Sequence, residues 1–192
     1  MFNKALTSKL YYLENGCHYT HKFYDKVVFG KIKNLTGGNV RMMITGSAPI
    51  AGDILNFLKV VFGCPIVEGF GQTETSAPAS LTGFNDPKSG HVGGPLTCIK
   101  MRLRDIPEMQ YLSTDENPRG ELCVKGPSVF KGYYKADDKN KEAFEEDGWL
   151  KTGDVAMVFP NGSIKIIDRA KNIFKLSQGE YIAPEKLENV YV

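Results

Sequence analysis

Residues 40–75 read VRMMITGSAPIAGDILNFLKVVFGCPIVEGFGQTET, and this stretch decides the fold. Apolar side chains alternate over 40–45, which predicts a short strand. A helical apolar pattern follows over 54–61, and residues 65–69 predict a second short strand that ends at a glycine. The order strand, helix, strand predicts a βαβ unit with parallel strands and ligand loops at their carboxyl ends.

The flanking segments have other patterns. Residues 1–36 carry apolar side chains at helical spacing and predict polar helices. After Gly90, short β-rich pieces between Gly, Pro and Asp turns predict a small antiparallel barrel or sandwich, with one helix at 137–145. The fold class is therefore α/β, part of a βαβ-type parallel sheet subdomain followed by a small β-barrel-like subdomain. The expected parts are an α/β sheet subdomain at 1–89, a β-rich subdomain at 90–168, and a hinge with the start of a further domain at 169–192.

The composition excludes several classes of protein. The 192 residues are 42% hydrophobic and 24% charged, which argues against disorder, collagen-like repeats and coiled coil. The 24 Lys and Arg and 22 Asp and Glu residues are interleaved, so no nucleic-acid or anionic-membrane partner is implied. No run approaches the ~18 to 20 apolar residues that span a bilayer. Four scattered cysteines without a CxxC pair or a signal peptide favour a reducing compartment.

The first informative motif is GFGQTET at residues 69–75, directly after a predicted strand. It is not a dinucleotide fingerprint, because Glu74 stands where that fingerprint has its third glycine. Two glycines, a threonine hydroxyl and a carboxylate suit a phosphate bound with Mg²⁺. The alternative is a glycine-rich turn in which Thr73 and Glu74 cap a following helix.

Two further motifs follow. In GWLKTGD, residues 148–154, an ionised Asp154 could accept hydrogen bonds from both hydroxyls of a ribose, although an aspartate after glycine is usually a turn residue. In DRAKNIFK, residues 168–175, four charges in eight residues usually indicate a solvated surface.

Taken together and in this order, the motifs resemble one family. With GSAP at 46–49 and GELCVKG at 120–126, they are similar to the adenylate-forming superfamily of acyl-CoA synthetases, luciferases and peptide-synthetase adenylation domains, from about Gly38 onward. The stretches that resemble eukaryotic long-chain fatty acyl-CoA synthetases are GFGQTE, GHVGGP, KGPSVFKGYY, DGWLKTGD and IIDRAKNIFKLSQGEYIAPEKLENVYV. Such enzymes make an acyl adenylate from ATP and a fatty acid, release pyrophosphate, and pass the acyl group to coenzyme A.

The resemblance implies roles for individual residues. Glu74 would hold Mg²⁺, Thr73 would contact the phosphate, and Lys175 would approach the site during thioester formation, so these three are the expected catalytic residues. Lys171 matches the hinge of the family. Asp154 would hold the ribose hydroxyls. The expected nucleotide and acyl contacts are Gly46, Ser47, Ala48, Gly69, Phe70, Gly71, Gln72, Thr73, Asp154 and Arg169.

Two parts of the family pattern are not found in these residues: the upstream phosphate loop that ends in a Pro-Lys-Gly type sequence, and the C-terminal domain with its adenylation lysine. No GxxxxGK[ST] loop replaces the first. We therefore expect a piece of a synthetase with little or no ligase turnover alone. Two alternatives stay open, a noncatalytic remnant that keeps nucleotide or partner binding, and an enzyme of the same superfamily for shorter or aromatic acids.

The resemblance also carries an expectation about location. Related enzymes are commonly held on the endoplasmic reticulum or the mitochondrial outer membrane with the catalytic body facing the cytosol. We expect the same of a full-length relative, and we expect this chain alone to be soluble because it contains no predicted transmembrane segment.

Overall fold

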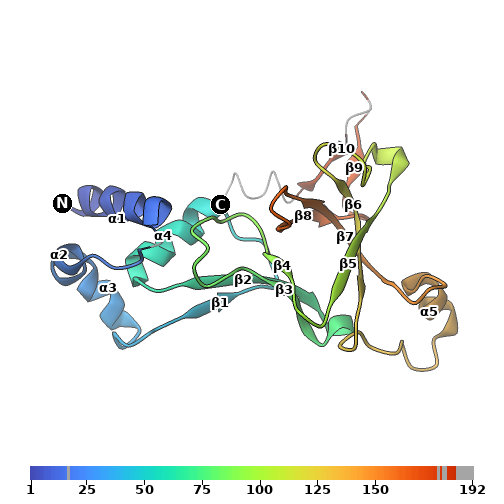
Figure 1. Ribbon diagram of the computed structural model, residues 1–192, viewed down its shortest axis with the longest axis horizontal. Helices are drawn as coiled ribbons and strands as arrows, with labels where there is room; N and C mark the ends of the chain where they lie inside the picture. Colours follow the sequence, from blue (N-terminus) through green and yellow to red (C-terminus); the bar gives the residue numbers. More distant parts are fainter. Residues whose placement is uncertain (17, 177, 179–180, 185–192) are drawn as a thin grey trace. The chain divides into compact units, whose positions relative to one another are not determined.

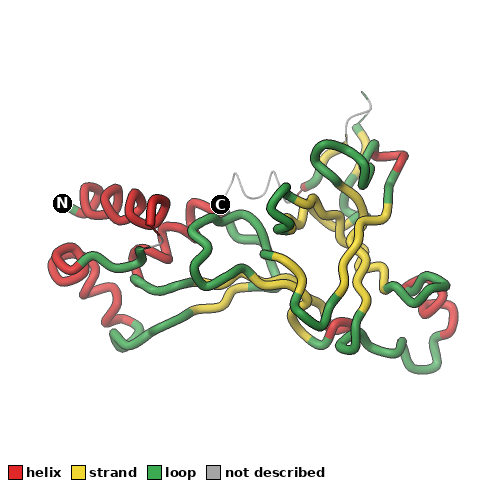
Figure 2. Tube along the Cα trace, in the orientation of Figure 1, coloured by secondary structure: helices red, strands yellow, loops and turns green. Residues whose placement is uncertain are grey.

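The computed structural model describes residues 1–16, 18–176, 178 and 181–184. The chain divides into two compact units, each described here by itself. Unit 1 comprises Met1–Glu68 and Thr82–His91, and unit 2 comprises Gly69–Leu81 and Val92–Val192. Figure 1 traces the elements along the chain, and Figure 2 shows that helix predominates in unit 1 and strand in unit 2.

Unit 1 opens with helices, as the sequence predicts. They are α1 (Phe2–Gly16), α2 (Lys22–Tyr24), the π-helical turn η1 (Asp25–Phe29) and α3 (Gly30–Leu35). Ala5 and Phe29 from this group pack with Val61 in one buried cluster. Among the described residues, no helix has the length and hydropathy needed to cross a bilayer.

The predicted βαβ unit is confirmed. It consists of β1 (Met43–Thr45), α4 (Gly52–Phe62) and β2 (Ile66–Gln72). Strands β1 and β2 are parallel, with Met43 opposite Ile66. Gly63 caps the C-terminus of helix α4; its φ of 64° is left-handed, and its N–H donates to the Lys59 carbonyl. Glycine fits this position because it adopts a positive φ without a steric penalty.

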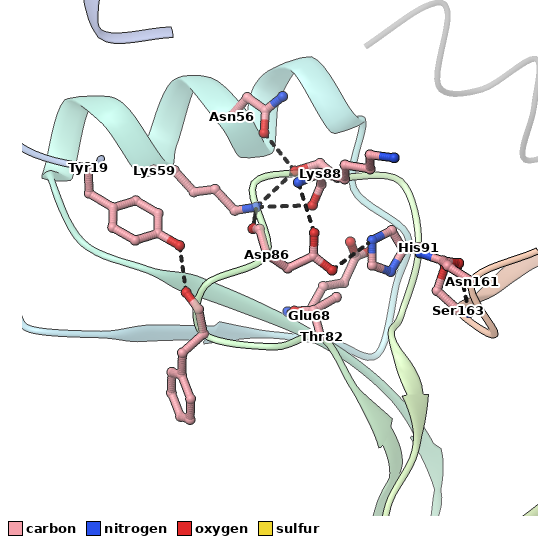
Figure 3. Close-up of polar contacts among 12 residues, drawn as sticks. Tyr19, Asn56, Lys59, Glu68, Thr82, Asp86, Lys88, His91, Asn161 and Ser163 are labelled. Carbon is pink, nitrogen blue, oxygen red and sulfur yellow. Dashed lines mark hydrogen bonds and ion pairs between the residues drawn. The ribbon is translucent and has the colours of Figure 1, made fainter. Parts of the chain in front are cut away.

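A polar network ties α4 to the loop at 82–91 (Figure 3). The Lys59 side chain is 2% exposed, and its Nζ lies 3.1 Å from Ser89 Oγ and 3.3 Å from the Lys88 carbonyl oxygen. Ser89 Oγ in turn donates to Asn56 Oδ1 at 2.7 Å. A buried ammonium is costly unless hydrogen bonds satisfy it, so these contacts fix the loop against the helix.

Glu68 is the last residue of β2 that belongs to unit 1. Its N–H donates to Thr82 Oγ1 at 2.9 Å, and its carbonyl accepts from the Thr82 N–H at 2.9 Å. The carboxylate is nearly inaccessible, because the residue is only 5% exposed. Burial raises the pKa of Glu68 to about 6, while the charge of Lys59 and a hydrogen bond from the Ile50 backbone oppose the rise.

In unit 2, β2 continues and pairs antiparallel with β3 (Ala77–Leu81), which in turn pairs antiparallel with β4 (Gly94–Pro95). The expectation that this strand ends at Gly69 is wrong, because β2 runs to Gln72. Gly69 and Gly71 of β2 allow close contact with β3. A Cβ added at Gly71 would lie 2.0 Å from the Ala77 carbonyl oxygen, so only glycine lets β3 approach so closely.

The β-rich part of unit 2 is an antiparallel sheet. Its order is β5-β6-β7-β8, and its strands are β5 (Lys100–Arg104), β6 (Arg119–Lys125), β7 (Leu150–Val158) and β8 (Ile164–Arg169). Leu122, Val124 and Ala156 lie in its buried core. The expected antiparallel, β-rich character of this part of the fold is thus confirmed, but the expected barrel-like closure is wrong, because β5 and β8 are edge strands in the described part of the chain.

Short elements complete unit 2. The predicted helix at 137–145 is confirmed as α5, although it ends at residue 143, because Phe144 is extended and bridges to Leu150. The remaining elements are η2 (Thr73–Thr75), η3 (Pro107–Met109), α5 (Asp137–Ala143), β9 (Phe174–Lys175) and β10 (Tyr181–Ile182).

The buried carboxyl of Glu68 makes stability depend on pH. Its pKa is about 6 in the folded chain against an ordinary 4.5, so the charged form costs about 2 kcal/mol of folding free energy above pH 6. That cost disappears as the pH falls below 4.5, where the group is protonated in both states. We expect Glu68→Gln to raise the free energy of unfolding at pH 7.5 by about 2 kcal/mol.

The check is urea denaturation of both chains between pH 7.5 and 4.5, with the gain of Glu68→Gln shrinking toward zero at the lower pH. Glu14→Gln, at an exposed position of α1, is the matched control and should change little. A gain that is equal at both pH values would contradict the assignment.

Candidate functional site

The turn η2 presents Thr73 and Glu74 at the end of β2. Thr75 holds this turn in place. It is fully buried, and its role was not predicted from the sequence. Thr75 Oγ1 accepts from the Gln72 N–H at 2.9 Å and lies 2.8 Å from the Ala77 carbonyl oxygen. These bonds close the turn on itself, so Thr73 is left exposed and Glu74 half-buried.

Gln72 joins the first motif to the second. Its side-chain Nε2 donates to Asp154 Oδ2 at 2.6 Å and to the Thr152 carbonyl at 2.9 Å. The two motifs are separated by 82 positions in the chain, yet this amide brings them into direct contact. Both residues belong to unit 2.

Asp154 lies inside strand β7 and not in a turn. It is 5% exposed, and its Oδ1 is 3.6 Å from Arg169 Nε, because β7 and β8 pair with Asp154 opposite Arg169. Burial raises the pKa of Asp154, while Arg169 and the Gln72 amide favour the ionised carboxylate. Arg169 itself keeps 57% of its side chain exposed, so it is accessible to a bound group.

Glu74 has a partner that the sequence analysis did not identify. Tyr133 donates its hydroxyl to Glu74 Oε1 at 2.7 Å, and the Phe130 N–H donates to the Glu74 backbone carbonyl at 2.8 Å. The nearby carboxylate raises the pKa of Tyr133. Glu74 Oε2 has no hydrogen-bond or ion-pair partner among the described residues. Tyr133 belongs to the stretch KGPSVFKGYY, which the sequence analysis quoted as a motif. The motif does not show that Tyr133 contacts Glu74, because the contact depends on the folded structure.

The other expected residues fall into three groups. Gly69, Phe70 and Gly71 form the strand that leads to Gln72, within unit 2. The three residues of the GSA stretch are exposed in the loop after β1, in unit 1, and are Gly46, Ser47 and Ala48. Lys171 is exposed in the turn after β8, and Lys175 lies in β9 with its side chain outside the described part of the structure.

Unit 2 contains two carboxylates with different surroundings, Asp154 and Glu74. Asp154 is held on one side by an amide and a guanidinium, which suits an acceptor of hydroxyl hydrogen bonds. Glu74 uses Oε1 as an acceptor for the Tyr133 hydroxyl, and its Oε2 has no partner among the described residues. No group of three or more His, Cys, Asp or Glu side chains in the described ranges could hold a metal ion by protein ligands alone.

Comparison with known proteins identifies the family. The family model described as AMP-binding enzyme matches residues 5–134. Long-chain-fatty-acid–CoA ligase 5 of Rattus norvegicus is 50% identical over 191 residues, which cover 100% of this chain and 28% of that protein. The chain thus spans less than a third of the length of the curated relatives it matches.

Solved structures of similar proteins support the same family. The A domain of a carboxylic acid reductase from Segniliparus rugosus, in complex with AMP and a co-purified carboxylic acid, has a TM-score of 0.75 and 31% identity, covering 96% of this chain and 28% of that one. An O-succinylbenzoate coenzyme A synthetase from Bacillus subtilis, in complex with ATP and a magnesium ion, has a TM-score of 0.67 and 28% identity, covering 79% and 31%.

The matched residues include β2, the turn η2 with Thr73 and Glu74, and Tyr133, which contacts Glu74. The family model covers more than half of the chain, and the identity with the rat ligase extends over all of it. The fold, the motifs and these similarities lead to one conclusion: this chain belongs to the AMP-binding enzyme family.

Proposed function

We propose that this chain supplies the nucleotide-binding residues of a long-chain-fatty-acid:CoA ligase, which activates a fatty acid with ATP to an acyl adenylate and then forms acyl-CoA. The observation that carries the proposal is the contact between Gln72 and Asp154. It brings the family's two nucleotide motifs together at one buried carboxylate, where an adenosine nucleotide needs an acceptor for its sugar.

Asp154 would hold the ribose. Its carboxylate offers acceptors only, so both sugar hydroxyls can donate to it in charge-assisted hydrogen bonds. Gln72 would act as its positioning residue, because the amide is itself fixed by the Thr152 carbonyl and can turn only one way. Arg169 stands beside Asp154 with an exposed guanidinium, which suits the phosphate side of the nucleotide.

Thr73 and Glu74 would face the phosphates. Mg²⁺ is usually held by one or two carboxylates together with substrate phosphates and water, so the single carboxylate of Glu74 fits such an ion. When bound, the ion would offset negative charge at the α-phosphate. Tyr133 would hold the Glu74 carboxylate in place while the second oxygen stays available.

The fatty acid and coenzyme A come into the proposal through the relatives. The rat protein is named a long-chain-fatty-acid–CoA ligase, and the reductase domain binds AMP with a carboxylic acid. The walls for adenine and acyl group would include Gly46, Ser47 and Ala48. The roles of Lys171 as hinge and of Lys175 in thioester formation belong to the same proposal. The proposal also includes domain limits at residues 89 and 168. It further includes a membrane location for the full-length relative, at the endoplasmic reticulum or the mitochondrial outer membrane.

Nucleotide binding tests the assignment of Asp154. We expect Asp154→Asn to weaken binding of AMP to the 192-residue chain by about tenfold or more, because the substitution removes the charge from two hydrogen bonds at once. Gln72→Leu should weaken it by about threefold to tenfold, because the carboxylate loses the amide that orients it. Isothermal titration calorimetry measures both.

Asp147→Asn serves as the control, since Asp147 is an exposed carboxylate in the same unit. Its affinity for AMP should match that of the unchanged chain. An unaltered affinity in Asp154→Asn, with AMP bound by the unchanged chain, would contradict the ribose assignment. Failure of the unchanged chain to bind AMP would contradict the proposal as a whole.

A chimaera tests the reaction itself. These 192 residues can replace the aligned 191-residue segment of the rat ligase. We expect the chimaera to form AMP and acyl-CoA from a long-chain fatty acid, ATP and coenzyme A, and Glu74→Gln in it to raise the Mg²⁺ concentration required for half-maximal rate by at least about fivefold. A folded chimaera that binds AMP and makes no acyl adenylate would favour the noncatalytic alternative.

A further inference from the structure

A short segment of unit 2 holds Glu74 at two points. The Phe130 N–H donates to the Glu74 backbone carbonyl at 2.8 Å, and the Tyr133 hydroxyl donates to Glu74 Oε1 at 2.7 Å. The rings of Phe130 and Tyr133 also contact each other, with centroids 4.9 Å apart. Residues 130–133 therefore form a clip that holds both the backbone and the side chain of Glu74.

Helix α5 supports this clip through a polar and an aromatic contact. Asn140 binds both backbone groups of Tyr133, because its Oδ1 accepts from the Tyr133 N–H at 2.6 Å and its Nδ2 donates to the Tyr133 carbonyl at 3.0 Å. Phe144, the residue that follows the helix, stacks on Phe130 with ring centroids 5.5 Å apart. A chain of contacts thus runs from α5 through the clip to the carboxylate of Glu74.

The backbone of the clip is shaped to admit the Asn140 amide. Gly132 has a φ of 137°, which residues with a side chain rarely adopt, and a Cβ added there would lie 2.8 Å from Asn140 Oδ1. Glycine at this position lets the chain pass directly beside the amide. Asn140 can therefore reach the backbone of the next residue, Tyr133.

The helix itself does not need the Asn140 side chain. Asparagine is a weaker helix former than alanine, and the backbone N–H and carbonyl of Asn140 already bond to Ala136 and Phe144. Both the oxygen and the amide nitrogen of the side chain are directed at Tyr133. The asparagine is therefore explained by the clip and not by the stability of α5.

The Tyr133 hydroxyl depends on this support. Tyr133 is 38% exposed, so the position of its ring is not fixed by a close-packed core. Asn140 fixes the backbone from which the ring extends, and the hydroxyl then meets Glu74 Oε1. Outer partners of this kind orient a metal-binding side chain and strengthen its hold on the ion.

We propose that Asn140 is a positioning residue for the cation site: it fixes Tyr133 so that the phenol occupies Glu74 Oε1 and leaves Oε2 for the Mg²⁺ that accompanies a nucleotide phosphate. The inference rests on the proposed role of Glu74 as a Mg²⁺ ligand and extends it to a residue outside the quoted motifs. Helix α5 thereby becomes part of the support of the nucleotide site.

The test measures how much Mg²⁺ strengthens ATP binding to the full 192-residue chain, by calorimetry with Mg²⁺ and with a chelator. Asn140→Ala and Tyr133→Phe should each reduce this gain by about threefold to tenfold. The double variant should lose no more than Tyr133→Phe, because the amide acts through the phenol. Alanine is the better helix former, so the loss cannot come from a weaker α5. AMP affinity without Mg²⁺ should stay unchanged, because the ribose contact at Asp154 is untouched.

Hydrogen exchange in the chain without ligands gives a readout that does not depend on a nucleotide. Asn140→Ala should speed exchange of the Tyr133 N–H by about tenfold or more, because that N–H loses its acceptor. Tyr133→Phe keeps the acceptor, so exchange at position 133 should stay slow. The Gln72 N–H, which donates to Thr75 Oγ1, should exchange at an unchanged rate in both variants and so reports an intact η2.

Lys141→Ala is the matched control, since it shortens the next side chain along the same helix. It should keep the whole Mg²⁺-dependent gain. A gain that survives Asn140→Ala, an equal loss in Lys141→Ala, or a double variant that loses the product of the two single losses would overturn this proposal alone. Equal ATP affinity with and without Mg²⁺ in the unchanged chain would contradict the Mg²⁺ role of Glu74 and this proposal together.

Discussion

The hydrogen bond from the Gln72 amide to the Asp154 carboxylate is the interaction on which the candidate site depends. A carboxylate that is 5% exposed is costly to ionise unless partners surround it. Arg169 contributes from 3.6 Å, and the amide contributes at 2.6 Å with a defined direction. The bond connects β2 to β7, so within unit 2 it also links β2 to the sheet β5-β6-β7-β8.

The backbone around this bond is arranged to permit it. Gly71 lets β3 lie so close to β2 that the strand continues to Gln72, and the buried Thr75 then turns the chain sharply. On the other side of the bond, the Thr152 carbonyl accepts from the Gln72 amide, and the Gly153 N–H donates to the Glu121 carboxylate.

The sequence was informative where the signal is local. Periodicity over 40–69 predicted the βαβ unit, because each apolar run sets its own strand or helix. The glycines of GFGQ indicated a loop. In the structure Gly71 lies in a strand and allows close contact with Ala77 of the neighbouring strand, which the sequence around Gly71 does not show. Barrel closure was wrong for a similar reason, since it depends on pairing between distant strands. Motif order pointed to Gln72 and Asp154, but the contact of Tyr133 with Glu74 spans 59 positions and has no local signature.

The central claim is that Asp154 recognises sugar hydroxyls, and a nucleotide without those hydroxyls tests it most directly. Affinities for AMP and for its 2′,3′-dideoxy analogue can be compared in the unchanged chain and in Asp154→Asn. The account predicts that the unchanged chain prefers AMP by about tenfold or more and that the variant shows almost no preference. An equal preference for AMP in both chains would contradict it.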